Sequence, residues 1–192
     1  MPFETEIGKT TLRLVTGDIA DQDTDAVVTA AHWRLNKGTG TDGTIHSKGG
    51  TKIYEECRRI GGCPIGDAVI TTAGNLKAQF VIHAVGPVWK GGDEHEPELL
   101  ASAYRRSLQV ANEHQLHSIS FPAISTGAFG YPIRLAAPVT LKTIIEYLER
   151  EQHNFNEIRL VLYTREDENS YATFMQALEQ LLIERARGAE PS

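Results

Sequence analysis

The chain has 192 residues, a length that suits one domain. Hydrophobic residues make up 41% and charged residues 23%, the balance of a globular protein rather than a disordered one. A net charge of -6 argues against broad nucleic-acid binding, which needs clustered Lys and Arg, but it leaves room for a small anion held by backbone N–H groups.

Two cysteines, Cys57 and Cys63, are too few for a disulfide framework or a closed zinc site. We expect both to be reduced, with no metal and no cofactor. The N-terminal residues 1–6 lack the apolar stretch of a secretory signal, and no run approaches the roughly 18 apolar residues of a membrane span. These features predict a soluble, cytoplasmic protein without a membrane partner, and we expect a monomer.

Strand-like and helix-like segments alternate along the chain. Short runs rich in β-branched residues predict strands at 11–16, 25–29, 68–73, 80–85, 118–124 and 158–163, and residues 2–7 add a candidate edge strand. Apolar stripes at spacings of three and four predict helices over 100–111, 133–148 and 171–182, and a further helix is expected over 44–59.

This alternation predicts a three-layer α/β/α domain with a mixed, mostly parallel sheet of about six strands. We assign residues 1–187 to this single domain and expect a disordered tail over 188–192. Ligands of such sheets bind at the carboxyl ends of the strands, so the loops that follow strands are the places to look for a site.

The first such loop is Gly17-Asp18-Ile19. A carboxylate leaving a strand can accept a hydrogen bond from an exocyclic amine, such as that of adenine. Gly-Asp is also an ordinary turn signal, and both interpretations stay open.

The second loop, residues 32–43, contains Gly38, Gly40 and Gly43. Closely spaced glycines let the backbone take conformations that a Cβ would forbid, so that successive N–H groups can form an anion-binding nest. Asp42 lies just before the predicted helix and fits either an N-cap or a site carboxylate.

The third loop, residues 124–132, follows a strand and opens a helix at Pro132. Its small and hydroxyl-bearing residues at a strand-to-helix junction fit a phosphate cradle assisted by the helix dipole. The chain has neither the Gly-Lys-Ser/Thr of a P-loop here nor the Gly-x-Gly-x-x-Gly dinucleotide fingerprint, which disfavours an oxidoreductase. Two phosphate-type loops at one edge of a sheet would suit a diphosphate.

Six segments, in order and at the expected spacing, resemble the signature blocks of macrodomains. These are Gly17-Asp18-Ile19, Thr24-Asp25-Ala26-Val27-Val28, Gly43-Thr44-Ile45-His46, Cys63-Pro64-Ile65-Gly66, Val81-Ile82-His83-Ala84-Val85-Gly86-Pro87 and Phe121-Pro122-Ala123-Ile124-Ser125-Thr126-Gly127. The chain is most similar to the MacroD-type ADP-ribosyl hydrolases, and the similarity extends over about residues 11–175.

The resemblance implies that ADP-ribose, or a substrate carrying it, is the partner. It assigns the adenine contacts to Asp18 and Ile19, and an aromatic contact with the adenosine to Tyr163. The residues that it places along the diphosphate and the distal ribose are Gly38, Gly40, Thr41, Ser125, Thr126, Gly127, Ala128 and Phe129. The aspartate that the family uses in hydrolysis corresponds to Asp42.

The departures from the family pattern lie around the distal ribose. The family has Asn-Ala-Ala-Asn where this chain has Thr29-Ala30-Ala31-His32, and its run of four glycines is here Lys37-Gly38-Thr39-Gly40. A histidine at the second asparagine could orient the ribose or transfer protons, so His32 is a candidate catalytic residue; it could also simply fill the space. The resemblance implies hydrolysis of an ADP-ribosyl ester, with a non-catalytic ADP-ribose reader and an ADP-ribose 1″-phosphate phosphatase as alternatives.

Overall fold

The computed structural model describes residues 3–162 and 169–189, and these form one seven-stranded sheet with helices on both faces. The strands are β1 (Phe3–Ile7), β2 (Thr10–Thr16), β3 (Ala26–Ala30), β4 (Ala68–Thr72), β5 (Phe80–Ala84), β6 (Ser118–Phe121) and β7 (Glu157–Leu162). Their order across the sheet is β1-β2-β7-β6-β3-β5-β4. The inner strands are parallel, whereas β1 and β4 at the two edges run antiparallel to their neighbours.

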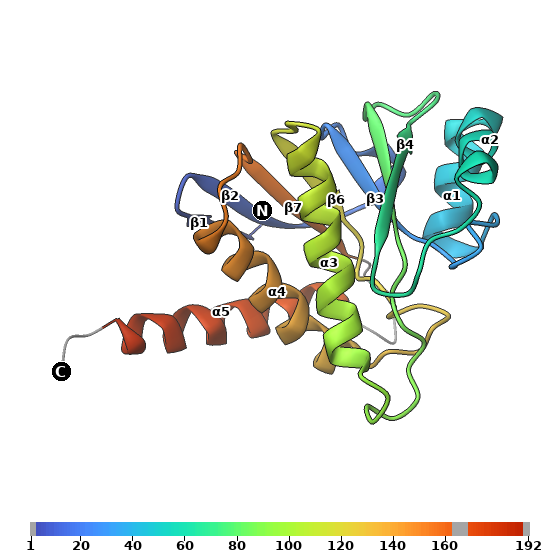
Figure 1. Ribbon diagram of the computed structural model, residues 1–192. Coiled ribbons are helices and arrows are strands. Elements are labelled where there is room, and N and C mark those ends of the chain that lie inside the picture. The colour runs from blue at the N-terminus through green and yellow to red at the C-terminus, as the bar shows by residue number, and fades with distance from the viewer. Residues whose placement is uncertain (1–2, 163–168, 190–192) are drawn as a thin grey trace.

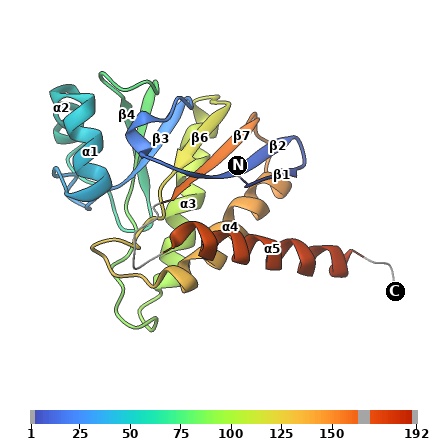
Figure 2. The same cartoon turned by 180° about the vertical axis from the view of Figure 1, so that it is seen from behind.

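The helices complete a three-layer architecture. They are α1 (Gly40–Gly49), α2 (Thr51–Ile60), α3 (Glu96–Glu113), α4 (Ile133–Arg150) and α5 (Ser170–Gly188), with a 3-10 turn η1 (Ile19–Asp21) after β2. One buried cluster joins the sheet to α3, α4 and α5, and a second joins the other face to α1, α2 and η1. Accordingly, α3 lies in front of the sheet in Figure 1 and behind it in Figure 2. The predicted α/β/α fold with a mixed sheet is confirmed.

The central strand β3 explains why the sheet needs both helical layers. Ala26 and Val28 belong to the cluster under α3 and α4, whereas Val27 belongs to the cluster under α1 and α2. All three are fully buried, which is the reason for a continuous apolar run rather than an alternating one.

The single helix expected over 44–59 is wrong in one respect, because two helices occupy this stretch. Gly50 has a φ of 86°, which a right-handed helix cannot contain, and it separates α1 from α2. Helix α1 also begins at Gly40, so Asp42 lies inside its first turn rather than before the helix. The N-terminus of α1 therefore belongs to the glycine-rich loop.

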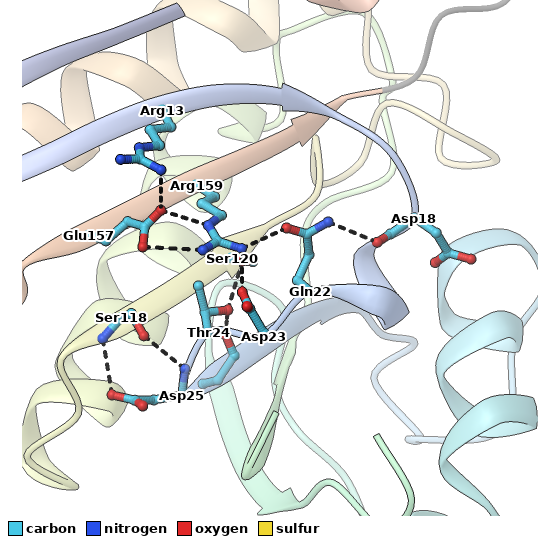
Figure 3. Close-up of polar contacts among 11 residues, drawn as sticks. Arg13, Asp18, Gln22, Asp23, Thr24, Asp25, Ser118, Ser120, Glu157 and Arg159 are labelled. Carbon is cyan, nitrogen blue, oxygen red and sulfur yellow. Dashed lines mark hydrogen bonds and ion pairs between the residues drawn. The ribbon is translucent and has the colours of Figure 1, made fainter. Parts of the chain in front are cut away.

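The connection from β2 to β3 is fastened to β7 by Arg159, as Figure 3 shows. The guanidinium donates to the carboxylates of Glu157 and Asp23 and to the amide oxygen of Gln22, over 2.7 to 3.2 Å. Gln22 in turn donates to the carbonyl of Asp18 at 3.1 Å. The segment that carries Asp18 is thus held against the sheet by long-range polar contacts.

At the other end of the chain, α5 includes Gly188, and residues 190–192 lie outside the described residues. The disordered tail therefore stays a prediction. Among the described helices, none combines the length and the apolar character that crossing a membrane requires.

Candidate functional site

A cleft of about 560 Å³ opens where β3, β6 and β7 end. Its lining consists of Ala30, His32, Gly38, Thr39, Gly40, Thr41, Asp42, Pro122, Ala123, Ser125, Thr126, Gly127, Ala128, Phe129, Val161, Leu162 and Ser170. The volume falls in the usual range of small-molecule sites, about 300–1,000 Å³. The carboxyl ends of parallel strands thus bring the second and third loops of the sequence together, as expected.

The loop after β6 leaves several backbone N–H groups facing the cleft without a backbone partner in the described chain. The carbonyl of Ser125 accepts from the N–H of Tyr131 at 2.9 Å, which closes the loop. Within the described chain, no backbone carbonyl accepts from the N–H groups of Gly127, Ala128 or Phe129. Three consecutive amides at the rim of a cleft are therefore available to a ligand, and such groups suit phosphate oxygens.

Ser125 is the strained member of this loop. Its φ of 67° is left-handed, which is uncommon for a residue with a Cβ and often marks a functional position. Its hydroxyl is buried and has no hydrogen-bond partner among the residues described. A Cβ built on Gly86 would lie 2.2 Å from this hydroxyl oxygen, so the loop can approach the end of β5 only because residue 86 is glycine.

The segment before α3 buttresses the same loop. The N–H of Trp89 donates to the carbonyl of Phe129 at 2.8 Å, and the Trp89 ring lies 4.6 Å from that of Tyr131 between centroids. Glu96, at the start of α3, accepts from the backbone N–H groups of Lys90, Gly92 and Glu94. Burial opposes ionisation of Glu96, but these donors prevail and hold its pKa at about 2.

Asp42 lines the cleft, and each of its carboxylate oxygens accepts a hydrogen bond from the protein. The hydroxyl of Thr29, from β3, donates to Oδ1 at 2.8 Å, and the N–H of Gly38 donates to Oδ2 at 2.7 Å. The residue is only 4% exposed and lies in the first turn of α1, where the helix dipole favours a negative charge. A Cβ on Gly38 would come within 2.9 Å of Oδ2, so this glycine is needed for the close approach.

A neutral polar cluster packs behind Asp42. Nε2 of His46 lies 3.7 Å from Oδ1 of Asp42, and burial lowers the pKa of His46 although the carboxylate acts in the opposite direction. Burial likewise lowers the pKa of His83 to about 3 and raises that of Cys57 to about 12. The nitrogen and sulfur atoms of these three residues lie within 4.8 Å of one another, but Nε2 of His83 already contacts the hydroxyl of Thr71 at 2.9 Å. His46, His83 and Cys57 are therefore neutral at pH 7 and place no charge of their own beside the carboxylate of Asp42.

His32 is exposed at the rim of the cleft, and its tautomer follows from one contact. The N–H of Arg34 donates to Nδ1 of His32 at 3.2 Å. In the neutral ring the proton is then on Nε2, which is left as a hydrogen-bond donor.

Comparisons with known proteins identify this arrangement. The Macro domain family model matches residues 28–140, which include both loops of the cleft. A Macro domain-containing protein of Caldanaerobacter subterraneus is 49% identical over 177 residues, covering 90% of this chain and 98% of that protein. The chain belongs to the macrodomain family.

Solved macrodomains share the whole fold. The Oceanobacillus iheyensis macrodomain with ADP superposes with a TM-score of 0.89 at 34% identity, over 96% of this chain and 98% of that one. The Trypanosoma brucei macrodomain in complex with ADP-ribose has a TM-score of 0.80 at 32% identity, over 87% of this chain and 68% of that one. Among the sequence relatives, a Cronobacter sakazakii protein named O-acetyl-ADP-ribose deacetylase is 42% identical over 173 residues, covering 88% of this chain and 94% of that protein.

Two of the residues predicted for the adenine end of this macrodomain, Asp18 and Ile19, do not line the cleft. Asp18 caps η1 by accepting from the N–H of Ala20 at 2.8 Å, and its other oxygen pairs with Lys48 at 2.9 Å. Burial acts to raise the pKa of Asp18, but Lys48 and the N–H of Ala20 together lower it. Ile19 is 2% exposed and belongs to the core, and Tyr163 lies outside the described residues. Their contacts with a nucleotide remain predictions.

Sequence reasoning missed part of the site. In the sequence Thr29 stands out only as a departure from the family pattern, yet in the structure it positions Asp42. Val161, Leu162 and Ser170 line the cleft without any motif of their own. Only the expected position of the last strand, beside the other parallel strands, could have indicated Val161 and Leu162.

Proposed function

We propose that this macrodomain binds ADP-ribose in the cleft and hydrolyses an ADP-ribosyl ester. The acyl group is an acidic side chain of a protein, or acetate as in O-acetyl-ADP-ribose. The observation that carries the proposal is a buried, doubly held carboxylate, Asp42, in the same cleft as an anion-binding loop.

Binding rests on backbone amides rather than on charge. The N–H groups of Gly127, Ala128 and Phe129 face no competing backbone carbonyl among the described residues, and the first turn of α1 adds further unpaired N–H groups. A diphosphate bound between the β6 loop and the first turn of α1 is stabilised by backbone dipoles on both sides. Such binding needs no cationic side chains, so it suits an acidic protein. The ADP- and ADP-ribose-bound relatives support this assignment.

In the reaction, the diphosphate fixes the distal ribose near Asp42. Each carboxylate oxygen of Asp42 keeps one lone pair beyond its protein donor, so it can orient and activate a water molecule. Nε2 of His32 donates to a ribose hydroxyl. Water attacks the ester, the C–O bond to the acyl group breaks, and the products are a carboxylic acid and the free hydroxyl of ADP-ribose. Positioning alone can remove several kcal/mol of the barrier.

The competing function is a reader that binds ADP-ribose without turnover. It is favoured by the replacement of the family's ribose-holding asparagine by the exposed His32.

One set of measurements separates the two functions. ADP-ribose at a hundredfold excess over its Kd should stabilise the protein by about 2.7 kcal/mol, which a thermal shift detects. Incubation with glutamate-linked ADP-ribosylated protein and with O-acetyl-ADP-ribose should release ADP-ribose. Absence of a thermal shift and of calorimetric heat at millimolar ligand contradicts binding. Tight binding without turnover on either substrate contradicts the hydrolase and establishes the reader.

A further inference from the structure

We propose that residues 32–37, in the connection from β3 to α1, form a docking surface for part of a protein substrate. The part that docks is an acidic peptide segment that flanks the ADP-ribosylated side chain. This inference rests on the proposed function, which places the ester bond beside Asp42.

The first observation is an exposed aromatic side chain with a cation above it. Trp33 is 48% exposed, and the guanidinium carbon of Arg34 lies 4.7 Å from the centre of its ring. Lys37 places its ammonium 4.9 Å from the ring of Tyr54. Tryptophan and arginine are the residue types that most often carry the binding energy of protein interfaces.

The second observation is that these cations are not neutralised. Lys48, Arg106 and Arg159 each form an ion pair with a carboxylate. Arg34 and Lys37 form no ion pair with any carboxylate of residues 3–162 and 169–189. In a chain with a net charge of -6, this loop is a local site for an anionic partner.

The third observation is that the backbone presents these side chains in a fixed arrangement. Leu35, at a left-handed φ of 55°, is only 2% exposed, and its N–H donates to the carbonyl of His32 at 2.7 Å. The carbonyl of Trp33 accepts from the N–H of Cys63 at 2.8 Å. A strained turn held by a buried anchor persists only when its surroundings determine it, and a preorganised loop loses little entropy on binding.

The fourth observation is location. His32 begins the loop and lines the cleft, and the loop runs directly into Gly38, which lines the cleft and binds Asp42. The acyl group of a substrate held for hydrolysis leaves the cleft at this end, so the peptide that carries it passes over Trp33 and Arg34. Ile65, two residues after the Cys63 whose N–H donates to Trp33, is a further exposed apolar side chain, at 47%.

The chemistry favours an acidic peptide over a nucleic acid. A long polyanion needs many clustered cations, whereas this loop offers two on a protein of net charge -6. Arg34 can bind one carboxylate in bidentate fashion, and the aliphatic part of the peptide can pack on Trp33.

The test compares three substrates: a peptide ADP-ribosylated on glutamate with acidic flanking residues, the same peptide with neutral flanking residues, and O-acetyl-ADP-ribose. Arg34→Glu should lower kcat/KM for the acidic peptide by about tenfold, mainly through KM, and the loss should shrink at high salt. Trp33→Ala should weaken both peptides. O-acetyl-ADP-ribose, which has no flanking peptide, should be hydrolysed by both variants as by the wild type. Arg187→Glu, the same charge change near the end of α5, is the matched control.

Three results would overturn the docking surface. In the first, Arg34→Glu hydrolyses the acidic peptide as fast as the wild type does. In the second, Arg34→Glu loses as much kcat/KM on O-acetyl-ADP-ribose as on the acidic peptide. In the third, the wild type hydrolyses an oligonucleotide ADP-ribosylated on its terminal phosphate faster than the acidic peptide. If the wild type hydrolyses none of these substrates, the hydrolase proposal fails. The docking surface is then tested separately, by measuring the affinity of the wild type for the two peptides. The acidic peptide must then bind the wild type about tenfold more tightly than the neutral one, and Arg34→Glu must remove the difference; equal affinities contradict the surface.

Discussion

At the scale of single residues, the chemistry of Asp42 depends on a neighbour far away in sequence. The aspartate itself could be predicted, because it follows a glycine-rich loop that resembles a known family. The role of Thr29 could not, since it arises only when β3 brings its hydroxyl within 2.8 Å of the first turn of α1. A β-branched residue suits a strand, and here its hydroxyl also replaces solvent for a buried carboxylate.

Asp42→Ala should lower the turnover of ADP-ribosyl esters by about tenfold or more while weakening ADP-ribose binding much less. A group that acts on water in the transition state contributes to kcat rather than to ground-state affinity, and such groups typically contribute about 10²–10⁴-fold. Steady-state kinetics and calorimetry with ADP-ribose measure the two quantities. Thr29→Ser, which keeps the hydroxyl donor, serves as the control and should retain activity. A variant that loses affinity and keeps kcat would show that Asp42 only shapes the pocket.

At the scale of elements, the phosphate-type loop after β6 is open to a direct test. Gly127→Glu should weaken ADP-ribose binding by about 100-fold or more, or about 2.7 kcal/mol, because a carboxylate would occupy the place of the diphosphate and repel it. The fold should survive, since nothing lies within 4 Å of a Cβ at residue 127 and its φ is not left-handed.

Calorimetry and circular dichroism together check this expectation. Gly188→Glu adds the same side chain where a Cβ also meets nothing within 4 Å, at the end of α5, and should leave binding intact. Normal affinity in a well-folded Gly127→Glu protein would remove the loop from the site.

Elements whose signal is local could be predicted, and those that depend on a single backbone angle could not. The stripes of α3, α4 and α5 and the apolar runs of β3 and β5 report burial directly. The boundary between α1 and α2 depends on the φ of 86° at Gly50, and glycine in a helical stretch does not reveal from sequence which φ it adopts.

At the scale of the whole molecule, the position of the site could be predicted from the sequence. The alternation of strands and helices implies parallel strands, and their carboxyl ends meet at the edge of the sheet where the cleft lies. What could not be predicted is how the loops are tied down. Arg159 on β7 reaches Gln22 and Asp23, and Cys63 binds the carbonyl of Trp33; both contacts join segments with no shared pattern. Such contacts are consequences of the completed fold, and no local sequence pattern indicates them.

The buried histidines make the stability of the whole fold sensitive to acid. Burial lowers the pKa of His83 to about 3 and also lowers that of His46. In the unfolded chain a histidine has a pKa of about 6.5, so between that value and about 3 the unfolded state binds a proton that the folded state refuses. The free energy of unfolding should therefore fall as the pH drops through this window, by up to about 1.4 kcal/mol per pH unit for His83, and be unaffected by His83 above it.

Urea unfolding between pH 7 and pH 4 isolates this contribution by comparing the wild type with His83→Gln, which keeps a polar partner for Thr71 but does not titrate. The variant is expected to be less stable at pH 7, because the buried ring packs against Cys57, yet its free energy of unfolding should depend less steeply on pH. Parallel curves for the wild type and His83→Gln between pH 7 and pH 4 would show that His83 does not cause the acid sensitivity. Glu96 acts at lower pH, because its pKa of about 2 places its loss of stabilisation between its ordinary value of 4.5 and 2.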